Sequence, residues 1–288
     1  MSSHAVPLIT LNNGQKIPQL GFGVYLIPPE ETEKCVLEAI KIGYRHFDTA
    51  HMYGNEKAVG AAIKKCGIAR NELFITSKLW ITEYGEGVTL PAIDKMLKRL
   101  DLEYIDLILL HFPYNDYIGA YKDLEKAYEQ GKVKSIGISN FEDTKLEELC
   151  DIAKIKPVLN QVELHPYFQQ NELRTRMDKY NTKIEAWAPL GHALTKIFDE
   201  ELIKKLAEKY KKTPAQIVLR RHIQRGIIII PKSQKPERMK ENFEIFDFEM
   251  SDEEIKEIDN LNGKEKRIQD EEEKLEKELK SAPAPSDD

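Results

Sequence analysis

Short apolar runs alternate with amphipathic stretches along most of the chain. The runs have strand length, and the stretches between them repeat apolar residues every three to four positions, as a helix facing a core does. Because parallel strands need helical connections, this alternation predicts a parallel sheet covered by helices. The predicted strands are 19–24, 44–49, 73–77, 105–110, 134–138, 158–163, 183–187 and 227–230, and the predicted helices are 30–42, 56–65, 90–100, 120–130, 143–153, 171–180, 200–210 and 214–224.

Eight such units in a chain of 288 residues favour a closed (β/α)8 barrel. The alternative is an open doubly wound sheet, but the expected G-x-G-x-x-G is missing between the first strand and the first helix. Asn13-Gly14, between two apolar runs, predicts a hairpin at residues 8–18. The expected fold class is therefore α/β, a (β/α)8 TIM barrel with an N-terminal β-hairpin and a charged C-terminal helical tail.

The C-terminal residues differ in composition from the rest of the chain. Residues 264–280 are a run of charges with few apolar residues, and the chain then ends in Ser-Ala-Pro-Ala-Pro-Ser-Asp-Asp. Such a composition predicts a weakly amphipathic helix followed by disorder. We therefore expect a single barrel domain over residues 1–263 and a charged tail over residues 264–288.

Charge and cysteine content narrow the class of protein. The formal net charge of -6 argues against binding to nucleic acid or to anionic membranes. Cys35, Cys66 and Cys150 lie far apart, which fits a reducing compartment and predicts neither a disulfide framework nor a metal site. The sequence has neither a secretion signal nor an apolar run long enough to span a membrane. We expect a soluble, cytoplasmic protein.

Polar and aromatic residues gather at the ends of the predicted strands. In a (β/α)8 barrel these ends form the face that carries the active site, so we expect the side chains to meet at one rim. They are Asp48 and Tyr53 after the second strand, Lys78 and Trp80 after the third, His111 and Phe112 after the fourth, Ser139 and Asn140 after the fifth, Gln161 in the sixth, Trp187 at the end of the seventh, and Lys232 and Ser233 after the eighth.

Three long segments carry a family resemblance. They are GYRHFDTAHMYGNEKAVG at 43–60, MLKRLDLEYIDLILLHFP at 96–113 and IIIIPKSQKPERMKENF at 227–243. In these segments the chain resembles the aldo-keto reductases, and the resemblance extends from the Asn13-Gly14 hairpin to about Leu261. The short loops look most like the compact microbial members, including the prostaglandin F synthase and diketogluconate reductase types.

The resemblance implies a catalytic tetrad of Asp48, Tyr53, Lys78 and His111. Hydride reduction places negative charge on a carbonyl oxygen, so an acid must lie within hydrogen-bond distance of it. Tyrosine is a poor acid near neutral pH, and a nearby Lys78 ammonium would lower its pKa while Asp48 holds Lys78 in place. Neutral His111 would donate an N–H to the substrate oxygen. His46 is expected on the same strand face as Asp48, deeper in the barrel and in a packing role.

The resemblance also implies NADP(H) as the cofactor. A flat aromatic face such as that of Trp187 is suited to stacking on a nicotinamide ring. Lys232 and Arg238 beside Ser233 suit a phosphate dianion, which favours NADPH over NADH. The residues implied to bind the nicotinamide carboxamide are Ser139, Asn140 and Gln161, and the other implied cofactor-binding residues are Leu190, Glu241 and Asn242.

A mostly apolar, aromatic pocket for a small-molecule carbonyl substrate is implied above the nicotinamide. Tyr25 and Phe112 each stand where tryptophan is usual in the family, which predicts a wider and less polar pocket. After Leu261 the chain lacks the Gly-Pro-Asp-Pro-like turn that covers the pocket in compact relatives. The expected substrate-binding residues are Tyr25, Trp80, His111 and Phe112, with Tyr114 nearby.

The leading hypothesis is a monomeric NADPH-dependent reductase of small aldehydes, ketones or dicarbonyls, with Tyr53 as general acid. One alternative is a Schiff-base aldolase with Lys78 as nucleophile, which leaves the phosphate site unexplained. The other is a nucleotide-binding accessory or sensor subunit on the same fold, against which the intact tetrad argues.

Overall fold

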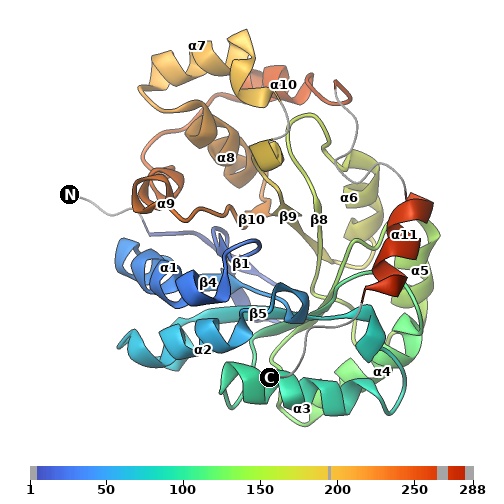
Figure 1. The fold of residues 1–288 in the computed structure, drawn as a ribbon. Helices are drawn as coiled ribbons and strands as arrows, with labels where there is room; N and C mark the ends of the chain where they lie inside the picture. The colour runs from blue at the N-terminus through green and yellow to red at the C-terminus, as the bar shows by residue number, and fades with distance from the viewer. Residues whose placement is uncertain (1–4, 194–195, 265–271, 283–288) are drawn as a thin grey trace.

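Eight parallel strands form a closed sheet at the centre of the molecule (Figure 1). The computed structural model describes residues 5–193, 196–264 and 272–282. The strands pair in chain order, and bonds from Gly21 N to Ile229 O (2.8 Å) and from Ile229 N to Gln19 O (2.9 Å) join the last strand to the first. The predicted barrel is thus confirmed. Its strands are β3 (Phe22–Gly23), β4 (His46–Asp48), β5 (Phe74–Leu79), β6 (Leu107–Leu110), β7 (Ile136–Ser139), β8 (Leu159–Glu163), β9 (Lys183–Trp187) and β10 (Ile228–Ile229).

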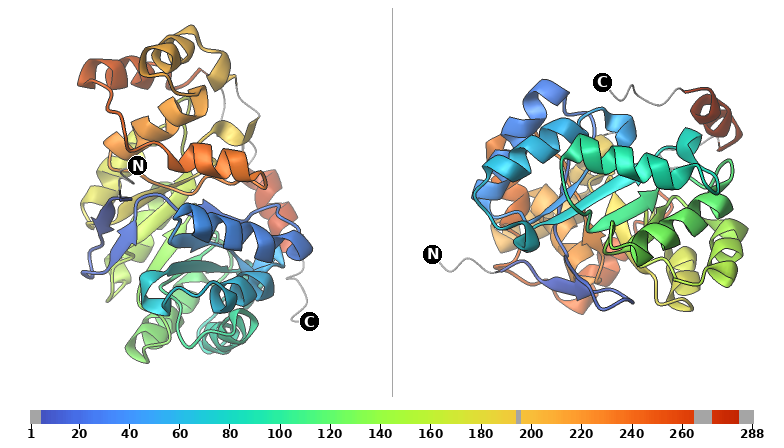
Figure 2. Two further views of the ribbon diagram at one scale, coloured as in Figure 1. Left: turned by 90° about the vertical axis from the view of Figure 1, so that its left-hand side faces the viewer. Right: turned by 90° about the horizontal axis from the view of Figure 1, so that it is seen from below.

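Helices surround this sheet on its outer side (Figures 1 and 2). All predicted helices are present, and none of the described helices is long and apolar enough to cross a membrane. The helices are α1 (Pro29–Ile42), α2 (Glu56–Lys65), α3 (Thr89–Leu100), α4 (Tyr117–Glu129), α5 (Asp143–Ile152), α6 (Asn171–Asp178), α7 (Glu201–Tyr210), α8 (Pro214–Gln224), α9 (Pro236–Phe243), α10 (Asp252–Asp259) and α11 (Glu272–Ser281).

The structure differs from the sequence-based expectations at some element ends. β5 extends to Leu79, so Lys78 lies inside a strand rather than after it. α9 and α10, short and highly charged, were not among the predicted helices. α11 bears out the helical part of the tail, while the disorder expected at its end concerns residues outside the described ranges.

The N-terminal hairpin closes the end of the barrel at which the strands begin, where Asn12 and Asn13 donate to the Pro157 and Lys134 carbonyl oxygens. β1 (Leu8–Thr10) pairs antiparallel with β2 (Lys16–Pro18), and Gly14 in the turn has a φ of 85°, which favours glycine. Ile17 is fully buried against side chains inside the barrel. The carboxyl ends of the strands therefore stay available for chemistry. The apolar residues clustered with Ile17 include Leu107, Leu109, Leu159 and Ile228.

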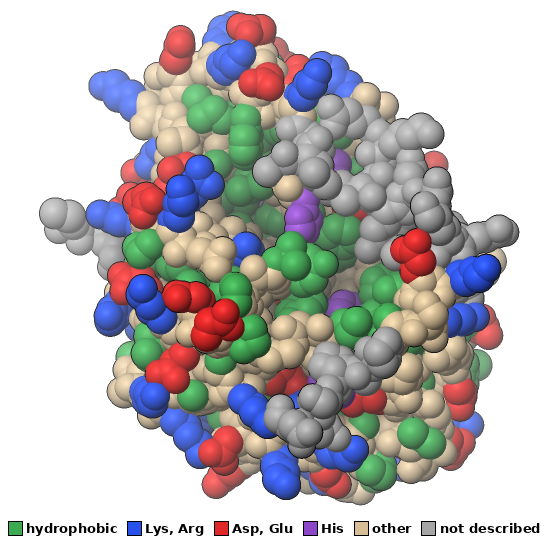
Figure 3. Space-filling model, viewed as in Figure 1, with side chains coloured by type: hydrophobic (Ala, Val, Ile, Leu, Met, Phe, Trp, Pro, Cys, Tyr) green, Lys and Arg blue, Asp and Glu red, His purple; other side chains and the backbone are tan. Residues whose placement is uncertain are grey.

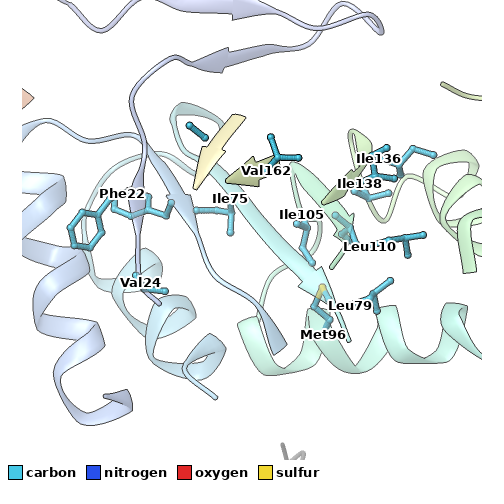
Figure 4. Packing of buried hydrophobic residues seen from close by; sticks show 14 of the residues in the cluster. Phe22, Val24, Ile75, Leu79, Met96, Ile105, Leu110, Ile136, Ile138 and Val162 are labelled. Atoms are coloured by element: carbon cyan, nitrogen blue, oxygen red, sulfur yellow. The ribbon is translucent and has the colours of Figure 1, made fainter. Parts of the chain in front are cut away.

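A second and larger cluster fills the layer between the strands and the helices (Figure 4). Alternate residues of each strand point outward into it, and Ile75, Leu79 and Leu110 are fully buried there. Met96 of α3 packs in the same layer. Burial on both faces explains why these strands are almost continuously apolar.

Gly60 of α2 provides a test of this packing. A Cβ at this position would overlap the backbone carbonyl oxygen of Leu100, at the end of α3. We expect Gly60→Ala to lower the free energy of unfolding by about 1–3 kcal/mol, because the two helices would have to move apart. Urea denaturation followed by circular dichroism measures the change. Lys57→Ala, on the exposed face of the same helix, should change it by less than about 0.5 kcal/mol, and equal effects would contradict the packing argument.

Candidate active site

Four side chains of the expected tetrad converge at the carboxyl ends of neighbouring strands. Asp48 ends β4, Lys78 is the next to last residue of β5, and His111 directly follows β6. Tyr53 closes a 3-10 turn that begins at His51 and ends at Gly54, which has a φ of 66°. Strand order and this turn together bring the four residues to one place.

Lys78 lies at the centre of the cluster. Its Nζ donates to Asp48 Oδ1 (2.5 Å), to the Thr49 carbonyl oxygen (3.0 Å) and to the Tyr53 hydroxyl (3.2 Å). These three partners match the three hydrogens of an ammonium. Burial lowers the pKa of Lys78, but Asp48 and Tyr53 outweigh burial and raise it above the ordinary 10.5. Lys78 is therefore charged and held in one position.

Tyr53 keeps its proton at neutral pH. Burial raises the pKa of its hydroxyl to about 12, against the lowering effect of the Lys78 charge. Lys78 thus acts in the expected direction, but the desolvation of the phenolate is the larger effect. A protonated hydroxyl beside an ammonium is the state that a proton donor requires.

His111 lies next to Tyr53, with 5.9 Å between the ring centroids and the rings nearly perpendicular. Burial, together with the positive charge of Lys78, holds the pKa of His111 well below the ordinary 6.5. The imidazole is therefore neutral, as expected, and carries one N–H that it can donate.

The residues expected at the nicotinamide form one hydrogen-bonded network across β7, β8 and β9. Ser139 Oγ donates to the Gln161 carbonyl oxygen (2.8 Å). Asn140 Nδ2 donates to the His111 carbonyl oxygen (3.0 Å), and Asn140 Oδ1 accepts from Trp187 Nε1 (2.8 Å). Asn140 therefore fixes the indole of Trp187 relative to His111.

Of the residues expected at the adenosine phosphate, Lys232 and Ser233 follow β10, and Arg238 lies on α9. Lys232 and Arg238 are exposed, and neither forms an ion pair with another described residue. Ser233, which follows Lys232 in the chain, is buried, and its Oγ accepts from Lys235 N (3.1 Å). Two unpaired cations and a hydroxyl are groups that suit a phosphate dianion. Two of the other expected cofactor residues lie on α9: Glu241, whose carboxylate accepts from the Thr213 hydroxyl, and Asn242, which is buried. The third, Leu190, follows β9 and is half-buried.

Aromatic side chains surround the tetrad as expected. Trp80 lies 5.4 Å from His111 between ring centroids, and Phe112 stacks on His111 at 5.0 Å. Tyr25, 46% exposed, lies 5.0 Å from the ring of Tyr53. The face of the molecule in Figure 3 is hollowed near its centre, where apolar side chains surround histidines. An apolar carbonyl compound would be desolvated in such surroundings.

The C-terminal tail reaches the aromatic residues. Trp80 Nε1 donates to the Ala282 carbonyl oxygen (3.3 Å), and Leu279 packs against the large apolar cluster. α11 lies beside the 3-10 turn Ile81–Glu83 that follows Trp80. The tail therefore contacts the expected pocket, which was not predictable from its charged sequence.

One residue of the site escaped the sequence analysis. Glu185 lies on β9 two residues before Trp187 and is fully buried. Its Oε2 accepts from Gln161 Nε2 (3.0 Å), and its Oε1 lies 3.6 Å from Nε2 of His46, which is buried deeper in the barrel as expected. Strand alternation could have found it, because Glu185 and Trp187 must share one strand face.

The closed barrel and the buried polar cluster at its carboxyl end define an enzyme of the (β/α)8 class. The family model described as "Aldo/keto reductase family" matches residues 19–263. The chain is 46% identical over 260 residues to a glyoxal reductase of Bacillus subtilis, covering 90% of this chain and 94% of that protein. It is 44% identical over 258 residues to the methylglyoxal reductase DkgA of Yersinia pestis, covering 88% and 92%. An aldo-keto reductase from Bombyx mori, solved in complex with NADP, has a TM-score of 0.88 and 33% identity, covering 98% and 99%.

The chain belongs to the aldo/keto reductase family. Membership confirms the expected barrel fold and an NADP(H)-dependent oxidoreductase. The roles of the individual residues and the domain boundary at residue 263 stay predictions.

The neutral state of His111 has a consequence for the pH dependence of catalysis. A group with a lowered pKa stays uncharged above that pKa, so His111 does not titrate near its ordinary 6.5. We expect kcat/KM for aldehyde reduction to be flat between about pH 5.5 and 7.5. An inflection near pH 6.5 that disappears in His111→Gln would contradict this.

Proposed function

We propose that this protein reduces the carbonyl group of small aldehydes, ketones and dicarbonyl compounds to alcohols with NADPH. The observation that carries the proposal is the Lys78 ammonium between the Asp48 carboxylate and the Tyr53 hydroxyl. Two relatives with more than 40% identity bear the names glyoxal reductase and methylglyoxal reductase, which supports small dicarbonyl substrates.

NADPH, held by Trp187 at its nicotinamide ring and by Lys232 and Arg238 at its 2′-phosphate, would supply a hydride to the carbonyl carbon. As negative charge develops on the carbonyl oxygen, Tyr53 transfers its hydroxyl proton to that oxygen. Lys78, 3.2 Å from the hydroxyl, stabilises the phenolate that remains, and Asp48 holds Lys78 in place. Neutral His111 donates an N–H to the same substrate oxygen and orients it. The surrounding aromatic residues exclude water, which strengthens these interactions.

Two exposed cations, one after β10 and one on α9, support NADPH over NADH. Lys232 and Arg238 form no ion pair with another described residue, so both charges are available to a 2′-phosphate. Arg238 can bind such a phosphate through two parallel hydrogen bonds. NADH has no 2′-phosphate and would leave both charges unused.

The Schiff-base alternative is disfavoured by the state of Lys78. A nucleophilic amine must be uncharged and reachable. Lys78 is fully buried, and its pKa lies above the ordinary value because Asp48 and Tyr53 outweigh burial. No specific observation on the described residues favours an accessory or sensor subunit. A cytoplasmic location and a monomeric state stay predictions.

Tyr53→Phe tests the proton donor. We expect kcat to fall about 100- to 10,000-fold, because the acid is lost while the aromatic ring stays. NADPH consumption followed by absorbance measures the rate, and quenching of tryptophan fluorescence measures NADPH binding, which should stay unchanged. Tyr121→Phe removes a hydroxyl on α4 that donates to the Ile155 carbonyl oxygen, outside the tetrad, and it should keep wild-type kcat. Wild-type kcat in Tyr53→Phe would contradict the assignment.

Arg238→Ala tests the phosphate site. We expect the KM for NADPH to rise about tenfold or more with little change in kcat, because a charge-assisted contact to the phosphate is lost. The KM for NADH should not change. Lys240→Ala, also exposed on α9, is the control and should leave both values unaltered. An unchanged KM for NADPH in Arg238→Ala would exclude Arg238 from the site.

A further inference from the structure

A second carboxyl group lies within the barrel below the tetrad. Gln161 Nε2 donates to Asp48 Oδ2 (2.8 Å) and to Glu185 Oε2 (3.0 Å). Gln161, Asp48 and Glu185 are all buried, with Glu185 fully so. The amide of Gln161 is thus held between two carboxyl groups from β4 and β9.

This arrangement fixes which end of the Gln161 amide faces a ligand. The Asp48 carboxylate, paired with Lys78, can only accept hydrogen bonds, so the NH2 group of the amide must face it. The second N–H is taken by Glu185. The amide oxygen is then the group that Gln161 has left to offer, and it accepts from an NH2 such as that of a nicotinamide carboxamide.

Among the described residues, no charged cation forms an ion pair with Glu185. Lys78 is already bonded to Asp48, and β10 contributes the apolar Ile228 and Ile229 next to β9. His46 lies 3.6 Å from Oε1 of Glu185, but burial lowers its pKa to about 3, so it is uncharged. Burial and the nearby Asp48 charge raise the pKa of Glu185 to about 8. Glu185 is therefore protonated at neutral pH.

We propose that Glu185 is a positioning residue for the nicotinamide. Its hydrogen bond with Gln161 keeps the amide oxygen of Gln161 directed toward the carboxamide, and because Glu185 is uncharged it places no negative charge near the ring. This inference rests on the proposed NADP(H) site. It assigns Glu185 no contact with the reacting atoms.

The charge of Glu185 then selects between the two cofactor forms. The ring of NADP+ is positively charged and that of NADPH is neutral, so a negative Glu185 favours NADP+. Below about pH 8 Glu185 is uncharged and does not favour NADP+. As the pH rises through this value Glu185 becomes negative, NADP+ binds more tightly, and the ratio Kd(NADPH)/Kd(NADP+) rises.

Two variants of Glu185 separate these roles. Glu185→Gln keeps an oxygen acceptor for Gln161 but has no charge to gain, whereas Glu185→Leu removes the acceptor at similar volume. Quenching of tryptophan fluorescence gives Kd for NADPH, for NADP+ and for adenosine 2′,5′-bisphosphate, which lacks the nicotinamide. Thermal unfolding monitors the fold of each variant.

In the wild type we expect Kd(NADPH)/Kd(NADP+) to rise about tenfold between about pH 7 and 9.5, and in Glu185→Gln to stay constant. Glu185→Leu should weaken NADPH binding about three- to tenfold at pH 7 and leave adenosine 2′,5′-bisphosphate unaffected. Glu56→Gln is the matched control, because Glu56 is also buried, has a raised pKa from burial, and bonds Ser77 and Arg99 in the helical layer. It should lower thermal stability without altering the pH dependence of the ratio.

The inference is overturned if Kd(NADPH)/Kd(NADP+) rises with pH equally in the wild type and in Glu185→Gln. It is also overturned if Glu185→Leu folds and binds NADPH with wild-type affinity. If Glu185→Leu does not fold, the pH dependence in Glu185→Gln decides. If the wild type binds NADPH and oxidises it with aldehydes, but the Glu185 variants have the wild-type Kd values and pH dependence, this inference alone is overturned. Wild-type protein that does not bind NADPH overturns both this inference and the proposed function.

Discussion

The buried ion pair between Lys78 and Asp48 is the constraint on which the rest of the site depends. Both side chains lie inside the barrel, where an unpaired charge costs several kcal/mol. Removing either partner would leave the other uncompensated, at a cost of about 3–5 kcal/mol. β4 and β5 must therefore keep their register, and with it the positions of Thr49 and Tyr53, which bond the same ammonium. The stability of the fold and the positioning of Tyr53 therefore both depend on the register between β4 and β5.

The ion pair orders neighbouring groups through hydrogen bonds. The second oxygen of Asp48 binds Gln161, and separate bonds link Asn140 to His111 and to Trp187. Preorganised groups of this kind need no rearrangement when charge develops on a substrate. Burial, the larger effect on each, holds the pKa of His111 below its ordinary range and raises that of Glu185, so both are uncharged near neutral pH. The field at Tyr53 is then dominated by Lys78 and Asp48.

The alternation of strands and helices in the sequence predicted the barrel and its first eight helices, because this alternation follows from local pattern. The family resemblance, not the pattern, implied the tetrad. The sequence did not predict the net effect on the pKa of Tyr53, since desolvation depends on how completely the surrounding elements cover the hydroxyl. Nor did it predict the contact between Trp80, which follows β5, and Ala282 of the charged tail, because the two residues lie far apart in the sequence and the tail has no distinctive pattern. Strand alternation could have placed Glu185 on the same strand face as Trp187, but its role could not be predicted without knowing that Gln161 and His46 lie beside it.

The proposed cofactor site has exposed charges at its adenosine end and buried charges at its nicotinamide end. Lys232 and Arg238 are exposed on a loop and a short helix, where charges cost little to keep and are screened by salt. Lys78 and Asp48 are buried in strands, where each charge fixes its neighbours and cannot be altered alone. Cofactor affinity can therefore change through surface residues while the reacting centre stays intact. The division follows from the fold, because the exposed charges come after the last strand and the buried charges lie on β4 and β5, inside the barrel.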